Sequence, residues 1–269
     1  MSNFLNNIDY RVARTRQELE LAYELVYKEY FKKGYINEDS FKLRLSIHNI
    51  LPQATTFIAK VENSVVATAT VIPNSPLGLP IDDMYTEEIS LFRKHNKKFC
   101  EVIMLASNTE LFRDGTSMML NAKKMFFIFF LFKRIFDYAK NYLKLDYIFI
   151  SVTPKHGLTY DYLHFTDIGP VKSYASINGT SGVGKCLKIS SAEKDIQKEK
   201  SGLHKMFFSK KTDPEKFENK TILSLQDIKD IFIDKTNILP QATEEQLNYI
   251  KQCYPTYDFS EIIPSVSTI

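Results

Sequence analysis

The stretch from Tyr147 to Tyr174, YIFISVTPKHGLTYDYLHFTDIGPVKSY, constrains the fold more than any other part of the chain. An apolar run over Tyr147–Val152 ends at the polar turn 153–156, and a short helical segment with Tyr160 follows before a second strand-like run. A strand that ends at a polar turn and leads into a helix places polar groups at the carboxyl edge of a sheet, where α/β proteins bind ligands. We therefore expect an α/β fold with a ligand site at this edge.

The preceding part of the chain shows the same alternation of strands and helices. The capping-box spacing of Thr15 and Glu18 predicts a helix that ends near Gly34. Further helices are predicted over 82–95 and 117–143, with a shorter one over 41–50. Strands are predicted at residues 10–13, 55–60, 64–71, 99–106 and 184–190. Parallel strands that alternate with helices and then close with an antiparallel hairpin predict a mixed central sheet with helices on both faces.

The composition changes near Ala192 and suggests a division of the chain. Residues 192–220 are rich in charge, which is typical of a solvated linker or flexible arm. Two helices are predicted beyond it, over 224–233 and 243–253, the second with the capping box Thr243-Glu244-Glu245-Gln246. We expect an α/β domain over residues 1–191, followed over 192–269 by a charged linker and a helical C-terminal extension.

Charge, cysteines and hydropathy exclude several classes of protein. A net charge of +3 over 269 residues is too small for a dedicated nucleic-acid binder. The cysteines Cys100, Cys186 and Cys253 lie far apart without a zinc-binding spacing, so we expect free thiols, no metal and a cytoplasmic protein. The N-terminus lacks the features of a signal peptide. The run MFFIFFLF at 125–132 is too short to cross a bilayer and predicts a buried helix.

An ordered set of motifs between Leu51 and Ile189 points to a known family. The segments are LPQATTFIAK, SPLGLP, CEVIMLAS, SVTPKHGLTYDYLHF and VKSYASINGT. This set resembles the N-acyl amino acid synthase branch of the GNAT acyltransferase superfamily, whose relatives include the acyl-homoserine lactone synthases. The resemblance covers about residues 10–189. It implies a GNAT fold in which two parallel strands, over 102–106 and 148–152, splay apart to admit a pantetheine arm.

The resemblance also implies an enzymatic activity. Members of the branch transfer a long-chain fatty acyl group from acyl carrier protein to the amine of an amino acid, which gives an N-acyl amino acid. The donor would be an acyl-phosphopantetheine on carrier protein or coenzyme A, with no permanently bound cofactor, and the lipid product could bring the enzyme into peripheral contact with a membrane. Two alternatives stay open: an enzyme that uses acyl-coenzyme A with another amine, and a non-catalytic module that binds lipid or a partner.

Glu101 and Tyr160 are the candidate catalytic residues. Amide formation needs an unprotonated amine, and a partly desolvated carboxylate at the position where the branch carries a strand Glu could take its proton. At the start of the following helix, Tyr160 could protonate the leaving thiolate, with Tyr162 as a substitute. The structural alternatives are a Glu101 paired with a nearby lysine and a Tyr160 that is an ordinary core aromatic.

Five further residues are predicted to bind substrate. The basic residue and histidine of the family's turn correspond to Lys155 and His156, although such a histidine could also anchor the turn. Met104 stands where the lactone synthases have an arginine, which argues against S-adenosylmethionine as acceptor. Phe129 belongs to the apolar run that could line an acyl tunnel. Arg113 lies in the loop before the long helix and is predicted to contact the donor.

The loop over residues 111–117, LFRDGTS, bears on the donor. Enzymes of the superfamily that use coenzyme A carry a glycine-rich loop here, whose amides bind pyrophosphate. This loop has one glycine and an aspartate, which fits a carrier-protein donor better. The basic residues that could meet the acidic helix of a carrier, or simply form a solvated helix face, are Arg113, Lys123, Lys124, Lys133 and Arg134.

Overall fold

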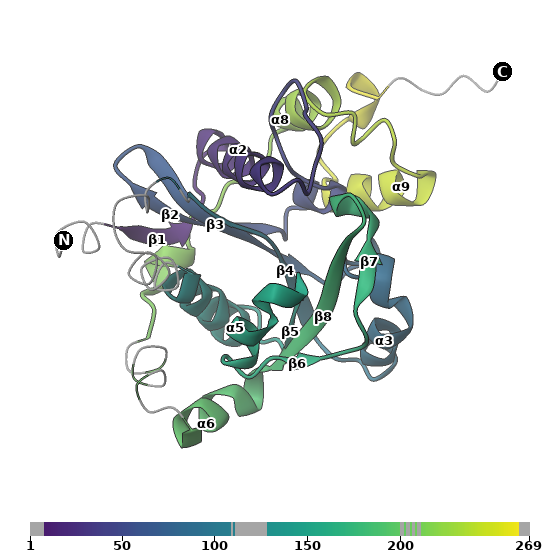
Figure 1. Ribbon diagram of the computed structural model, residues 1–269. Helices are drawn as coiled ribbons and strands as arrows, with labels where there is room; N and C mark the ends of the chain where they lie inside the picture. Colours follow the sequence, from purple (N-terminus) through teal and green to yellow (C-terminus); the bar gives the residue numbers. More distant parts are fainter. Residues whose placement is uncertain are drawn as a thin grey trace.

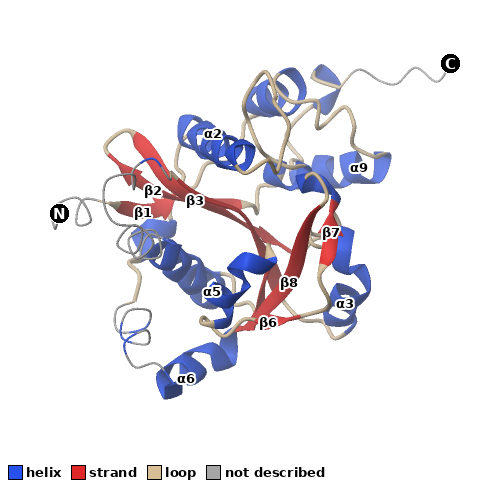
Figure 2. Ribbon diagram, in the orientation of Figure 1, coloured by secondary structure: helices blue, strands red, loops and turns tan. Residues whose placement is uncertain are grey.

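A computed structural model describes residues 8–108, 110, 128–199, 202, 205, 208 and 211–263, without the side chains of Ser176 and Glu199. Its centre is a mixed sheet with the strand order β1-β2-β3-β4-β5-β8-β6, and β7 pairs with β8 (Figures 1 and 2). The strands are β1 Asp9–Val12, β2 Thr55–Val61, β3 Ser64–Pro73, β4 Phe99–Ser107, β5 Tyr147–Val152, β6 Thr166–Asp167, β7 Lys172–Tyr174 and β8 Thr180–Lys188. The alternation in the sequence therefore predicted the sheet correctly.

The centre of the sheet is open because β4 and β5 separate. These two strands are parallel and pair only where Phe99–Val102 faces Tyr147–Ile150. Beyond that point β4 carries a bulge: Thr68 and Thr70 of β3 pair with residues 106 and 103, so two residues of β4 lie opposite one of β3. One of the two, Met104, has a φ of 56°. Since a bulge bends its strand, β4 turns away from β5, and the predicted splay is present.

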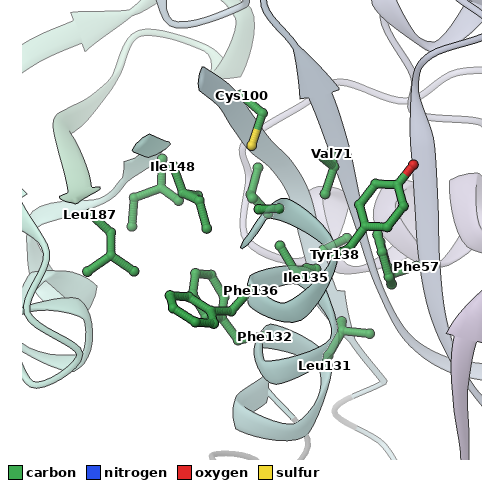
Figure 3. Packing of buried hydrophobic residues seen from close by; sticks show 14 of the residues in the cluster. Phe57, Val71, Cys100, Leu131, Phe132, Ile135, Phe136, Tyr138, Ile148 and Leu187 are labelled. Atoms are coloured by element: carbon green, nitrogen blue, oxygen red, sulfur yellow. The ribbon is translucent and has the colours of Figure 1, made fainter. Parts of the chain in front are cut away.

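Helices cover both faces of the sheet (Figure 1). On one face lie α2 (Arg16–Lys32) and α3 (Asp82–Lys94). On the other lies a helix over residues 128–137, which continues as the π-helix Tyr138–Tyr142, together with α5 (Gly157–Asp161). Figure 3 shows the second face, where helix residues Leu131, Ile135 and Phe136 pack against Ile148 and Cys100 of the sheet.

The segment between α2 and β2 differs from the prediction. The helix predicted over 41–50 was wrong: only Ile47–Ile50 forms a 3-10 turn. The carboxylate of Asp39 accepts hydrogen bonds from the amides of Phe41 and Lys42, and Lys42 has a φ of 55°, which an α-helix does not contain. The segment is fixed by packing instead, because Leu45 is buried in the cluster that α2 forms with the sheet.

The chain beyond β8 folds back onto this core. A helix, α6 (Ile189–Glu199), follows β8 directly, where the charge-rich composition predicted a linker. Its apolar residues Ile189, Ala192 and Ile196 lie on one face and are buried against the sheet. The remaining helical elements are the 3-10 turns Pro214–Phe217 and Phe259–Glu261, α8 Leu225–Lys229, the π-helix Asp230–Asp234 and α9 Glu244–Cys253.

Elements α8 and α9 pack beside α2 (Figure 1). Ile231 and Ile250 are fully buried in the same cluster as Val26 of α2. The guanidinium of Arg16 at the start of α2 forms ion pairs with Asp227, at 3.1 Å, and with Asp230. The C-terminal segment over 211–263 is thus integrated into the packing of the α/β core.

Candidate active site

A cavity of about 620 Å³ lies at the diverging ends of β4 and β5. Its walls include residues 101–107 of β4 and residues 150–153 of β5 and the following turn. This is the carboxyl edge that the strand-turn-helix pattern at 147–174 indicated. The opening exists because the two strands stop pairing after Val102 and Ile150.

The cavity is lined from both faces of the sheet. Successive residues of a strand point to opposite faces, so Glu101 shares the face of Phe99, which packs against α3. On the opposite face, Ile128 and Phe132 of the long helix line the cavity together with Tyr160. Lining residues from the Glu101 side include Tyr30, Tyr35, Arg44, His48, Asp83, Tyr174 and Gln246. The gap between the strands therefore connects two chemically different compartments.

Glu101 is a buried carboxyl group on the wall of this cavity. Its side chain is 1% exposed, and its Oε2 accepts a hydrogen bond of 2.8 Å from the backbone amide of Ile81. Burial raises the pKa of Glu101 to about 8; the Ile81 amide opposes this rise, and the negative charges of Asp82 and Asp83 add to it. A carboxyl group with such a pKa exchanges protons near neutral pH, as a general base must.

Tyr160 lies on the opposite wall. It is buried, and its ring packs edge-on against Phe165 and Phe132, with centroids 5.7 and 6.5 Å away. Burial raises the pKa of the Tyr160 phenol above its ordinary value of 10. The phenol therefore keeps its proton near neutral pH and can act as a donor.

Several polar groups of the lining lack a partner within the described part of the chain. The hydroxyls of Tyr35, Ser151 and Thr153 are buried there without a hydrogen bond. Buried hydroxyls are almost always paired in native proteins, so unpaired ones on a cavity wall indicate a polar ligand. Burial also lowers the pKa of His48 to about 4, which keeps this imidazole neutral.

The predicted substrate-binding residues have different positions in the structure. Met104 and His156 line the cavity. Lys155 is exposed and is not among the lining residues. Phe129 is half-buried against the core and does not line the cavity, although its neighbours Ile128 and Phe132 do. Arg113 lies outside the described residues.

Two of the basic residues predicted to face a carrier protein have structural roles. Lys133 is buried and forms an ion pair of 2.8 Å with Asp137. Arg134 donates a hydrogen bond of 2.8 Å to the hydroxyl of Thr212, which fastens the C-terminal segment. For Lys133 the prediction was wrong, because this side chain is buried, whereas for the half-buried Arg134 it stays a prediction. Lys123 and Lys124 lie outside the described residues.

Sequence reasoning missed the Glu101-side wall of the cavity. Tyr30, Tyr35 and Arg44 belong to the end of α2 and the segment after it, part of which was predicted as a helix. Gln246 comes from α9, which was predicted to lie outside the catalytic domain. Its sequence signal was the capping box, where its side chain accepts a hydrogen bond from the Thr243 amide, and that signal says nothing of a cavity.

Two absences bear on the chemistry. Over the residues that the structure describes, no cluster of histidine, cysteine, aspartate and glutamate could hold a metal ion. Within the same residues, none of the helices has the length and apolar character needed to cross a bilayer.

A mixed sheet that opens between two parallel strands is the architecture of the GNAT acyltransferases, and the protein is an acyltransferase. The family model of the N-acyl amino acid synthase FeeM matches residues 21–184. The chain belongs to this family. The GNAT-type fold and the family predicted from the motifs are thereby confirmed.

The chain is also similar to solved structures, and the similarity to one of them, FeeM, agrees with the family match. The structure of FeeM, an N-acyl amino acid synthase from uncultured soil microbes, is 26% identical with a TM-score of 0.58, and the match covers 70% of this chain and 94% of FeeM. The acyl-homoserine lactone synthase LasI is 9% identical with a TM-score of 0.48 over 69% of this chain and 92% of LasI. An acyl-CoA N-acyltransferase from Pseudomonas aeruginosa is 10% identical with a TM-score of 0.43, over 66% and 98%. A search of curated proteins gave no match.

Proposed function

We propose that this acyltransferase joins a long-chain fatty acyl group to the amine of an amino acid. The observation that carries the proposal is the cavity through the sheet, with Glu101 on one face and Tyr160 on the other. The compartment beside Glu101 contains both acidic and basic side chains, among them Asp83 and Arg44, as a zwitterionic acceptor requires. The compartment beside Tyr160 contains apolar residues such as Ile128 and Phe132.

The proposed reaction begins at Glu101. The ammonium of the acceptor has no lone pair, so it must lose a proton before it can attack the thioester carbon. The ionised Glu101 takes this proton and passes it to solvent. With a pKa near 8, Glu101 is ionised in roughly one molecule in ten at pH 7, and this carboxylate binds a proton more strongly than an ordinary one.

The second half of the reaction involves Tyr160. Attack of the amine forms a C–N bond and a tetrahedral intermediate, whose collapse breaks the C–S bond. Tyr160 donates its hydroxyl proton to the leaving sulfur, and the second proton lost by the nitrogen restores the phenol. The products are an amide and a thiol, with one proton released overall.

The donor in this proposal is an acyl group on the phosphopantetheine of acyl carrier protein. The hydroxyls of Ser151 and Thr153 on the wall of the gap could pair with amide groups of a pantetheine arm. The sequence LFRDGTS at 111–117 lacks the glycines of a pyrophosphate loop, which favours a carrier protein over coenzyme A. Each methylene of a fatty chain buried in the apolar compartment would contribute about 0.8 kcal/mol.

Mass spectrometry of the reaction products tests this proposal. Purified protein is incubated with the twenty amino acids and with dodecanoyl groups carried either by acyl carrier protein or by coenzyme A. We expect N-dodecanoyl amino acids from the carrier-protein reaction, and little product from coenzyme A. Equal product from both donors would overturn the carrier assignment, and no amide product from either would overturn the proposed activity.

A further inference from the structure

The compartment beside Glu101 carries a cation that the proposed reaction does not use. Arg44 is half-buried on the cavity wall, in the segment between α2 and the 3-10 turn at Ile47. Its backbone amide donates a hydrogen bond of 3.2 Å to the carbonyl of Tyr23 in α2. The next residue, Leu45, is anchored in the core, so the position of Arg44 is defined by packing on both sides.

Arg44, Glu101 and the Tyr30 phenol line the same cavity. The positive charge of Arg44 lowers the pKa of Tyr30, and the negative charge of Glu101 raises it, although burial is the largest effect and lifts this pKa to about 12. Both charges therefore act on the same hydroxyl across the cavity. An α-amino acid carries its ammonium and its carboxylate on the same carbon atom, so a site for it needs an anionic and a cationic group close together.

Tyr35 provides a second, independent observation at the same place. Its ring packs edge-on against Tyr30 with the centroids 5.7 Å apart, and it lines the cavity. Its hydroxyl is buried and makes no hydrogen bond to any described residue. A donor without an acceptor, in a cavity that a guanidinium also lines, fits an anionic oxygen that a ligand supplies.

We infer that Arg44 and Tyr35 bind the α-carboxylate of the acceptor, while its amine faces Glu101. This inference rests on the proposed function and names the part of the site that would distinguish an amino acid from a simple amine. The guanidinium contributes charge and paired N–H donors, and the phenol contributes one further hydrogen bond. The amino acid would thus be held at its backbone atoms, with its side chain directed elsewhere in the compartment.

The test compares each of the twenty amino acids with its own primary amide, which keeps the ammonium but lacks the carboxylate. Dodecanoyl-carrier protein is the donor, and kcat/KM is measured for both forms. Wild type should prefer the acid, and Arg44→Gln should raise KM for the acid about 10- to 100-fold, as expected for a lost hydrogen bond between charged groups. The same variant should change KM for the amide and for the donor by less than about threefold.

Three further variants separate recognition from a structural effect. Tyr35→Phe removes only the hydroxyl and breaks no hydrogen bond among the described residues. It should raise KM for the amino acid about tenfold and leave KM for the primary amide unchanged. Lys42→Gln removes an exposed cation of the same segment that does not line the cavity, and it should have little effect on either form. Arg44→Lys should restore part of the preference for the acid, since the charge returns without the planar fork.

The outcomes are distinct. If wild type acylates amino acids but Arg44→Gln keeps the wild-type ratio of acid to amide, the carboxylate site is wrong and the proposed function stands. An equal loss for acid and amide would assign Arg44 a structural role and also overturn the inference. If wild type acylates no amino acid at all, the proposed function itself fails.

Discussion

Two buried glutamates, Glu18 in helix α2 and Glu101 in the central strand β4, have opposite electrostatic surroundings. Glu18 at the first turn of α2 is bound by both guanidinium N–H groups of Arg11, at 2.7 and 2.8 Å, and by Lys60 at 2.8 Å. These hydrogen bonds lower the pKa of Glu18 far below its ordinary value. Glu101 has one backbone N–H as hydrogen-bond donor and acidic neighbours, and its pKa rises to about 8.

The difference shows how the fold uses the same side chain for two purposes. Glu18 ties the end of β1 to α2 and to β2, and its proton plays no part. Burial penalises the charge of Glu101, so this carboxyl group is mostly protonated at neutral pH and its ionisation costs stability. A buried carboxyl group whose pKa lies near neutral pH is expected of a proton-transfer group. We therefore expect substitution of Glu18 to lower stability but not activity, and substitution of Glu101 to lower activity but not stability.

The largest expected effect is on catalysis at Glu101. Replacing it by Gln keeps the shape of the side chain but removes the base, so kcat for acyl transfer should fall about 100- to 10,000-fold. Steady-state kinetics with dodecanoyl-carrier protein measure this loss, and circular dichroism verifies the fold. Normal turnover by Glu101→Gln would sink the proposed role of this residue.

The next effect is on stability at Glu18. Glu18→Gln leaves the buried Arg11 with only Asp9 as an ionised partner, at 2.8 Å, and should cost about 3 kcal/mol of unfolding free energy. Urea denaturation gives this value. Because Glu18 does not line the cavity, kcat of the folded variant should stay within about twofold of wild type, where the Glu101 variant loses its activity. If Glu18→Gln lost much of its kcat but kept its stability, Glu18 would not have the purely structural role that distinguishes it from Glu101.

The pH dependence of stability should differ between the two variants. The native pKa of Glu101 is raised from 4.5 to about 8, so its ionisation destabilises the fold progressively as pH rises through this interval. The unfolding free energy of Glu101→Gln should be close to that of wild type near pH 5 and should exceed it by about 3 kcal/mol near pH 8. Glu18 has a lowered pKa, so its contribution is present above pH 4.5 and is lost only as the solution becomes more acidic.

Urea denaturation of wild type and both variants at pH 5, 6, 7, 8 and 9 gives the comparison. The Glu18→Gln deficit should be nearly constant over this range, whereas the Glu101→Gln gain should grow with pH. If the gain does not change with pH, Glu101 has an ordinary pKa in the folded protein.

The smallest effect is expected at Tyr160, on the far wall of the same cavity. Tyr160→Phe removes the proton donor for the leaving group but keeps the ring that packs on Phe132 and Phe165. A thiolate is a fair leaving group without protonation, so kcat should fall only about tenfold. Single-turnover measurements isolate the chemical step. Tyr162→Phe is the matched control: Tyr162 is exposed and does not line the cavity, so an equal loss there would remove Tyr160 from the mechanism.

Much of this architecture could be predicted from local patterns. The strand-turn-helix at 147–165, the strand around Glu101 and the capping signals of Thr15 and Thr243 depend on neighbours in the sequence, so the chain itself reports them. Thr15 does accept a hydrogen bond from the Glu18 amide, at 3.2 Å. The Glu18 carboxylate, however, pairs with Arg11 and Lys60 instead of completing the capping box. A four-residue motif cannot predict these ion pairs, because they depend on residues in two strands.

The sequence by itself thus determined the order of elements, the family and the strand that carries the candidate base. Only the tertiary structure decided which side chains face the cavity from distant segments: Arg44 and Tyr35 after α2, and Gln246 on a helix beyond the matched family region. It also buried Lys133 in an ion pair with Asp137, and it joined Arg134 to Thr212 of the C-terminal segment. The physical reason is the same in each case: burial and charge compensation depend on contacts between residues far apart in the chain, and no local spacing encodes them.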